Sequence, residues 1–396
     1  MEAYASDWLQ LILRWVHLIT GIAWIGASFY FVWLDNSLAP PQDKADADKG
    51  IGGELWAVHG GGFYVVRKFR VAPETLPAAL HWFKWEAYWT WLSGFALLVV
   101  MYYANARVYL IDRSVADLAP WQAIAISVGF IVLGWYFYDQ LCKRLGLERE
   151  AWIAGAMIAF VAACAWGLSQ LFSGRGMYIE IGAILGTIMV ANVAHIIIPS
   201  QRRLVQAKER GVPPDAIEGL RGKQRSVHNN YFTLPVLFVM ISNHYPMTYG
   251  HPHAWLILVA ILLLTAYVRH FFNLRHKGRV VWAIPISAAI AAAALAVAIA
   301  PAKPKAGAEV SFALVQAIVV QRCAGCHADK PTQEGFVVAP KDVRLDTPER
   351  IAASAQKIYE QAVATRAMPI GNLTGMTDEE RATIAAWAAA SRDAGR

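Results

Sequence analysis

The sequence is poor in charged residues and carries few cysteines. Only 16% of its 396 residues are Asp, Glu, Lys or Arg, whereas 57% are hydrophobic, and 16 of them are Trp. So low a charged fraction excludes an ordinary soluble protein of this length. A cleavable signal peptide is not expected either, because no basic segment precedes the first apolar run, residues 8–34, which is also too long for the apolar core of such a signal.

Apolar runs instead recur along the first three quarters of the chain. A helix needs ~20 such residues to cross ~30 Å of hydrocarbon. We predict eight membrane-spanning helices, at residues 8–34, 81–104, 119–141, 151–172, 177–199, 229–245, 254–274 and 280–300. The sixth run is short and contains Pro235, but the charge distribution requires an even number of spans. The predicted fold class is all-α, a polytopic eight-helix transmembrane bundle.

The basic residues orient this bundle. The connections after the odd-numbered spans hold eighteen Lys and Arg residues, and those after the even-numbered spans hold three. Because basic connections stay on the cytoplasmic side, both termini are predicted to be periplasmic. The net charge of +7 belongs to the inner connections, since residues 309–396 carry ten basic and eleven acidic residues. Anionic lipid head groups explain this charge, and an anionic substrate could also be drawn there, so no nucleic-acid partner is expected.

Two of the four cysteines form a recognisable cofactor motif. Cys323 and Cys326 are three positions apart and are followed at once by His327, which is the pattern of covalent c-type haem attachment with a histidine axial ligand. Met368 is the predicted second axial ligand, with Met376 as the alternative. A zinc site would need a further Cys or His pair nearby, which the sequence lacks, and a redox dithiol would leave His327 unexplained.

These observations predict the domain organisation. Residues 1–300 form the membrane domain, with an insert at about 51–72 that we expect to be a small hairpin lying on the bundle. Residues 301–308 are a linker, and residues 309–396 are a class I cytochrome c domain with one covalent haem c. Because haem c is attached outside the bacterial cytoplasm, the prediction is a multi-pass protein of the bacterial inner membrane with a periplasmic cytochrome domain.

Histidines are the most frequent candidates for chemistry within the membrane. His17 lies nine residues after Trp8, about 14 Å deep at ~1.5 Å per residue, and Arg14 shares its helix face. The predicted topology places four others towards the inner side: His81, His195, His228 and His270. Any one of them could equally make an interhelical hydrogen bond. Together they suggest an inner polar pocket for a substrate or for b-type haem.

Four stretches of the chain resemble a known family. They are residues 14–17 and 21–26 (RWVH and GIAWIG), 54–62 (ELWAVHGGG) and 368–377 (MPIGNLTGMT). Together they resemble the bacterial membrane-integral cytochrome c urate oxidases over essentially the whole chain. The resemblance implies oxidation of urate to 5-hydroxyisourate, with electrons passed through haem c to a soluble cytochrome c or a terminal oxidase. Hydrogen peroxide is then not the stoichiometric product.

The implied reaction needs a base and a site for a planar anion. Histidine is suited to be the base near neutral pH, so His81, His195, His228 and His270 are the candidate catalytic residues, without assigned roles. Because haem c takes one electron at a time and an inner pocket would be far from it, we expect an intermediate b-type haem, with His17 as its best-placed ligand.

Two alternative functions stay open at this point. The first is a quinol dehydrogenase that uses the same haem c, and the second is an electron-transfer protein without catalysis.

The assembly state also stays open. Gly182-x-x-x-Gly186 allows close helix contact in a homo-oligomer, although such a motif more often packs within one bundle.

Overall fold

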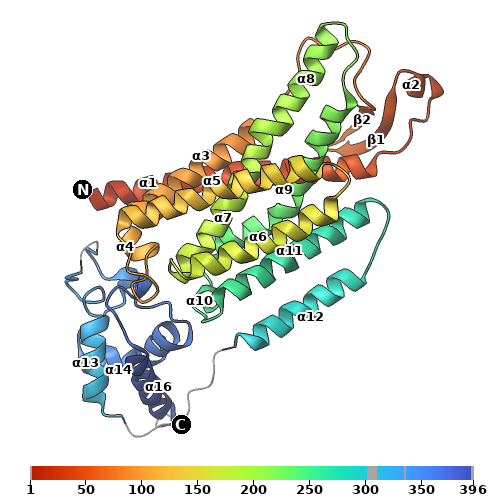
Figure 1. Cartoon of the computed structure of the whole chain (residues 1–396). Helices are drawn as coiled ribbons and strands as arrows, with labels where there is room; N and C mark the ends of the chain where they lie inside the picture. The colour runs from red at the N-terminus through yellow and green to blue at the C-terminus, as the bar shows by residue number, and fades with distance from the viewer. Residues whose placement is uncertain (1, 301–309, 334–335, 394–396) are drawn as a thin grey trace.

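The computed structural model describes residues 2–300, 310–333 and 336–393, and the described chain is predominantly helical. The predicted all-α class is therefore confirmed. The long helices lie side by side in one bundle, and a smaller helical unit sits against one end of it (Figure 1). The predicted linker, 301–308, falls outside the described residues.

Helices occupy each of the eight ranges predicted to be apolar spans. They are α1 (Glu2–Ser37), α3 (Trp85–Leu98) with the π-helix η1 (Val99–Tyr103), α5 (Pro120–Leu145), α6 (Glu150–Ser169), α7 (Gly174–Ala191) continued by the π-helix η2 (Asn192–Ile197) and by α8 (Ile198–Glu209), α9 (Ala216–Ser242), α11 (Ala254–His276) and α12 (Ala283–Ala298). The short helices α2 (Lys44–Asp48), α4 (Ala106–Tyr109) and α10 (Pro246–Tyr249) lie in the connections.

Among the described residues, five helical stretches are long and apolar enough to cross a membrane. They are Asp7–Ser37, Pro120–Leu145, Glu150–Ser169, Gly174–Glu209 and Ala254–His276. Three helices do not meet this test: α3 has 14 residues before η1, α12 has 16, and α9 begins with a charged segment. Length and composition thus single out fewer spans than the eight predicted.

Helix α7 lies at the centre of the bundle. Its side chains at Tyr178, Ile181, Ile184, Leu185 and Ile188 are almost completely buried, whereas large apolar side chains on the outer helices are exposed, among them Trp121 and Trp152. A helix that is apolar on all sides needs neighbours on all sides. In lipid this association rests on close packing rather than on the hydrophobic effect.

A buried polar network joins α5, η2 and α9. The guanidinium of Arg225 donates to Asp139 Oδ1 at 3.1 Å and to Asn192 Oδ1 at 3.2 Å, and the Asn192 amide donates to Tyr138 Oη and to Asn229 Oδ1. Lys143 reaches the other oxygen of Asp139 at 2.6 Å. Because each charge has an opposite charge or a hydrogen-bond partner, the network holds three helices together.

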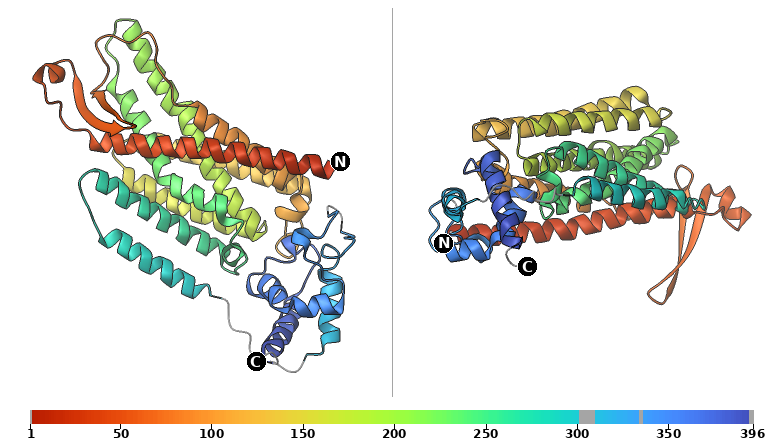
Figure 2. Two further views of the ribbon diagram at one scale, coloured as in Figure 1. Left: turned by 180° about the vertical axis from the view of Figure 1, so that it is seen from behind. Right: turned by 90° about the horizontal axis from the view of Figure 1, so that it is seen from below.

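The insert forms a two-stranded antiparallel hairpin, β1 (Ile51–His59) and β2 (Gly62–Phe69). Gly60 and Gly61 supply the positive φ angles of its tight turn. The hairpin does not lie on the bundle as expected. It extends sideways, across the direction of the long helices, with its turn far from them (right view of Figure 2), and Phe63 beside the turn is 83% exposed.

The C-terminal unit has a separate hydrophobic core. It contains α13 (Phe312–Arg322), α14 (Pro348–Ala353) and α16 (Asp378–Asp393), and its buried residues include Val315, Val319, Ile351, Ile384 and Trp387. A capping box begins α16, in which Thr377 N donates to Glu380 Oε2 and Glu380 N donates to Thr377 Oγ1. The unit lies beside α4 (Figure 1), and a short helix that follows Met368, η5 (Ile370–Asn372), contacts α4.

The buried network yields a stability prediction. Arg225→Ala would leave Asp139 deep in the bundle with only the half-exposed Lys143 as a cation. Breaking a buried ion pair typically costs about 3–5 kcal/mol, so the thermal unfolding midpoint in detergent should fall by roughly 5–10 °C. Arg221→Ala on the same helix is the matched control, because its ion pair with Glu218 is 57% exposed on the arginine side. Equal shifts in the two variants would contradict this assignment.

Candidate functional site

A cavity of about 470 Å³ lies between α1, α3, α7 and α9. Its volume is within the range typical of small-molecule and cofactor sites, and its wall is mostly apolar, as in such sites. Five small residues leave this space open: Gly21, Gly94, Gly182, Ala183 and Gly186. Trp24 and Trp91 are also part of the wall, and the Trp91 indole donates to Thr187 Oγ1 at 3.0 Å.

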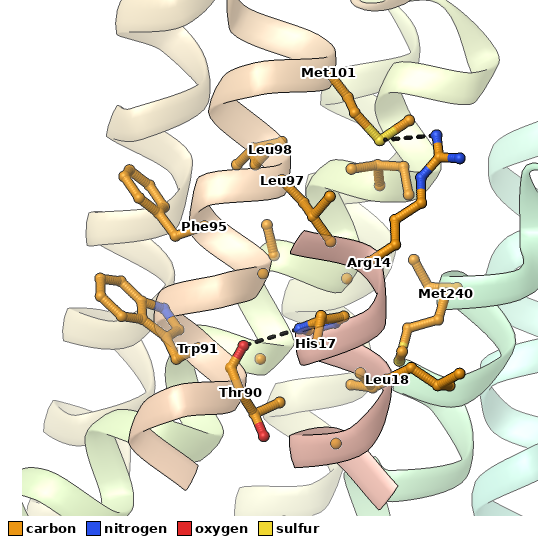
Figure 3. A pocket seen from close by; sticks show the side chains of 18 of the residues that line it. Arg14, His17, Leu18, Thr90, Trp91, Phe95, Leu97, Leu98, Met101 and Met240 are labelled. Carbon is orange, nitrogen blue, oxygen red and sulfur yellow. Dashed lines mark hydrogen bonds between the residues drawn. The ribbon is translucent and has the colours of Figure 1, made fainter. Parts of the chain in front are cut away.

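Two histidines line this cavity, His17 on α1 and His244 after the end of α9. His17 is the one held by hydrogen bonds to α3. Its Nδ1 is 2.9 Å from the carbonyl oxygen of Thr90 (Figure 3) and 3.2 Å from Ser93 Oγ. Because a carbonyl can only accept, Nδ1 carries the proton and Nε2 keeps its lone pair. Gly94 is required here, since a Cβ at this position would lie 2.8 Å from His17 Cε1. An imidazole held in this way can serve as a base or as a metal ligand.

Two arginines line the cavity without an ion-pair partner among the described residues. Arg14, one turn before His17, has only the sulfur of Met101 as a hydrogen-bond acceptor, at 3.3 Å (Figure 3). Arg175, at the start of α7, donates to Asn243 Oδ1 at 2.9 Å and stacks over the Tyr109 ring at 5.1 Å. Two cations with no counter-charge favour an anionic ligand.

The Arg175 end of the cavity lies next to the C-terminal unit. Tyr109, under Arg175, belongs to α4, and the carbonyl of the preceding Val108 would be 2.8 Å from a Cβ at Gly371. A second close approach places Thr365 O 1.9 Å from a Cβ built at Gly250, which follows α10. Only glycine permits such backbone contacts, so the segment around Met368 rests directly on this end of the bundle.

The four histidines predicted to be catalytic are not brought together. None of them lines the cavity. His81 is exposed in the loop before α3 and contacts the Phe83 ring, and His195 is exposed on η2 beside Trp135. His228 lies between Tyr138 Oη at 2.8 Å and Glu150 Oε2 at 2.7 Å.

The last of the four also has a local partner. His270 Nδ1 is 2.7 Å from Tyr231 Oη, and the two rings stack. The structure therefore does not gather the four histidines in one inner pocket. Each of them contacts different residues.

Sequence reasoning missed three cavity residues at this end: Arg175, Asn243 and His244. In the sequence, Arg175 is one of the three basic residues in the connections after the even-numbered spans. A usable signal was present, because an isolated arginine at the start of a very apolar helix has few reasons to be there except a ligand or a helix contact. Asn243 and His244 follow the end of another helix, α9, so their proximity to Arg175 is set by packing.

A buried carboxyl group on α7 was missed as well. Glu180 is completely buried, and its Oε2 accepts from Ser127 Oγ at 2.6 Å, which in turn is 2.6 Å from Tyr103 Oη. Among the described residues, its Oε1 has no hydrogen-bond partner. Its helix neighbour Ile179 lines the cavity, whereas Glu180 does not and bonds to α5 instead.

In the C-terminal unit, the geometry around the haem motif fits a haem ligand. His327 Nδ1 is 2.9 Å from the carbonyl oxygen of Val343, which leaves Nε2 free to bind iron. Arg381 donates to Met368 O at 2.9 Å and thereby holds the Met368 segment. Met376, the alternative ligand, is only 3% exposed and belongs to the core of the unit.

The other interpretations of the motif find little support. Burial raises the pKa of the Cys323 thiol to about 12, whereas redox dithiols have a lowered thiol pKa. Over the described ranges, no group of three or more His, Cys, Asp and Glu side chains could hold a metal ion, so a zinc shell is not formed there.

Comparison with known proteins gives one match. The profile of the family described as Urate oxidase N-terminal matches residues 3–300, which includes the whole cavity and ends before the C-terminal unit. This confirms the relation to urate oxidases that the sequence motifs indicated. No curated protein and no solved structure matches the chain.

The cavity wall leads to a second stability prediction. A Cβ at Gly182 would lie 2.4 Å from Val239 Cγ1, whereas a Cβ at Gly186, one turn further along α7, meets nothing within 4 Å. Gly182→Ala should therefore destabilise the protein by about 1–3 kcal/mol through overpacking. Gly186→Ala should be neutral or stabilising by up to about 1 kcal/mol, because alanine favours helix. Thermal unfolding of the two variants measures this, and a reversed order would refute the α7–α9 packing described here.

Proposed function

The chain belongs to the urate oxidase N-terminal family, and from this we propose that it is a membrane-integral urate oxidase linked to a cytochrome c. In this proposal eight helices span the bacterial inner membrane, and both termini and the cytochrome domain are periplasmic. Urate reacts with water to give 5-hydroxyisourate, two protons and two electrons. The electrons leave through the protein's own haem c to a soluble cytochrome c or a terminal oxidase, and hydrogen peroxide is not formed.

The observation that carries this proposal is the cavity. Urate is a planar anion, and the cavity combines two tryptophans in its wall with two arginines, Arg14 and Arg175, that have no acidic partner in the part of the chain that the structure describes. Such arginines can neutralise an anion and donate hydrogen bonds to its carbonyl oxygens. An aromatic wall suits the faces of a purine ring. The site thus offers what this substrate class requires.

His17 is our choice for the base within this site. Its Nδ1 is held by Thr90 O, so its free Nε2 can take a proton from water or from a ring nitrogen of the substrate. The sequence predicts His81, His195, His228 and His270 as base or binding groups, but they lie outside the cavity. In this proposal they do not contact the substrate.

The proposed haem c is held by four residues of the C-terminal unit. Cys323 and Cys326 attach it covalently, and His327 and Met368 are the axial ligands, as the geometry of their neighbours allows. The bound group supplies one-electron acceptance. Because the Met368 segment rests on α4 beside Arg175, the cavity and this unit are neighbours.

A b-type haem is the competing occupant of the same cavity. The free Nε2 of His17 also suits an iron ligand, and the two arginines could hold propionates. A cavity beside the C-terminal unit removes the distance argument for an intermediate carrier, whereas the transfer of two electrons to a one-electron acceptor still favours one. The absorption spectrum of the purified protein distinguishes the two cases, since a b-type haem adds bands to those of haem c.

The proposal is tested by adding urate to the oxidised, purified protein without oxygen. We expect the haem c absorption to change to that of the reduced form, with 5-hydroxyisourate appearing in solution. Reduction by dithionite but not by urate would contradict the proposal. If a quinol then reduced the haem, the quinol dehydrogenase would become the better description, and if neither did, the chain would be an electron-transfer protein.

The arginines give a prediction about substrate binding. Arg14→Met and Arg175→Met each remove a charged hydrogen-bond donor worth about 1.5–3 kcal/mol, so KM for urate should rise by roughly 10- to 100-fold. Arg107→Met is the matched control, because Arg107 is an exposed arginine on nearby α4 that does not line the cavity. Steady-state kinetics with an artificial electron acceptor measure the effect. An unchanged KM in both cavity variants would place urate elsewhere.

A further inference from the structure

The hairpin carries an apolar face that nothing in the described chain covers. Its register pairs Trp56 with Val65 and Val58 with Phe63, and since alternate residues share a face, these four side chains lie on one side of the ribbon. Their exposed fractions are 62%, 44%, 69% and 83% in that order. An isolated two-stranded hairpin is marginally stable in water, so this face calls for a partner.

The composition of the hairpin separates a charged base from an uncharged tip. Residues 55–66 contain no Asp, Glu, Lys or Arg. At the base, Arg67 pairs with Asp46 and Glu54, and Lys68 pairs with Asp35. Edge strands that face water usually carry charges, which discourage association. Twelve uncharged residues at an exposed tip are therefore unsuited to water.

The direction of the hairpin identifies the partner. It projects sideways from the bundle at the end where α1 terminates, across the direction of the long helices (right view of Figure 2). If those helices cross a membrane, the hairpin runs parallel to its surface. The predicted orientation puts this end on the inner side, where the connections hold eighteen of the Lys and Arg residues and attract anionic lipid head groups.

Exposed aromatic side chains also lie on the bundle near the base of the hairpin, where Lys68 pairs with Asp35 of α1. Tyr30 and Phe31 near the end of α1, with Phe83 and Trp85 at the start of α3, are 47%, 39%, 51% and 60% exposed, and the Phe31 and Phe83 rings are in contact at 4.8 Å. Exposed Trp and Tyr at one level of a helix bundle are typical of the membrane–water interface. The hairpin thus extends the interfacial surface of the protein away from the bundle.

We propose that this face of the hairpin is a membrane anchor that inserts into the interfacial region of the inner leaflet, with Trp56, Val58, Phe63 and Val65 in contact with lipid. The proposal rests on the membrane location proposed above but not on the reaction. The insertion depth typical of interfacial elements is about 5–10 Å. The basic connections around the hairpin favour a leaflet that contains anionic phospholipid.

The test uses the full-length haem-loaded protein in nanodiscs that contain phosphatidylglycerol and phosphatidylcholine. A Val58→Cys variant is labelled with an environment-sensitive fluorophore, and Val212→Cys, in an exposed loop at the same end, is the matched control. We expect the label at position 58 to be blue-shifted and quenched by a lipid with a nitroxide near its head group, and the label at position 212 to be quenched by aqueous iodide.

Two outcomes would overturn the proposal. Equal iodide quenching at both positions would place the hairpin in water. Protection of position 58 from both quenchers, together with label-to-label energy transfer in nanodiscs holding two chains, would show that a second copy of the chain covers the face. A further variant, Phe63→Ser with Val58→Cys, should increase iodide quenching at position 58, while haem content and urate-driven haem reduction stay unchanged. If urate failed to reduce the haem in all variants, the proposed reaction would be wrong. The quenching data would still show whether the hairpin inserts into the membrane, because they do not depend on turnover.

Discussion

The structure depends on one constraint, which is that polar groups inside an apolar bundle need partners of their own. In a chain with 16% charged residues, most helices meet this constraint by having few polar side chains. Where polar groups do occur in the bundle, they fall into a paired set and an unpaired set. The paired set stabilises the fold, and the members of the unpaired set that line the cavity mark the candidate site.

The paired set is the network of Arg225, Asp139 and Asn192, in which each charged group has an opposite charge or an amide beside it. Its components come from three helices, so it fixes their relative positions. Arg14 and Arg175 line the cavity with no acidic partner among the described residues, and their acceptors are a thioether and an amide oxygen. Arg269, which also has no acidic partner there, is buried away from the cavity and donates to Asn230 Oδ1. Because Arg14 is exposed and Arg175 is half-buried, both cavity guanidinium groups are accessible to an anionic ligand.

Close backbone contacts join the C-terminal unit to the end of the bundle where the cavity lies. Glycines at 250 and 371 allow backbone to approach backbone, so the segment after Met368 sits against α4 and α10. Arg175 connects this contact to the cavity through the Tyr109 ring. A substrate site placed here would be close to the unit that carries the haem motif, and the proposed reaction would need no carrier across the membrane.

The sequence by itself determined the helical class, the relation to urate oxidases and the haem motif, because each depends on local composition or on residues adjacent in the chain. It also singled out His17, whose depth follows from helix rise alone. It did not show that His17 lines a cavity whereas His81, His195, His228 and His270 lie outside it, nor did it reveal Arg175 with Asn243. Only the tertiary structure decided those questions, because which side chains share a cavity is set by the packing of four helices, and the hydropathy of each helix is the same whichever way it is rotated.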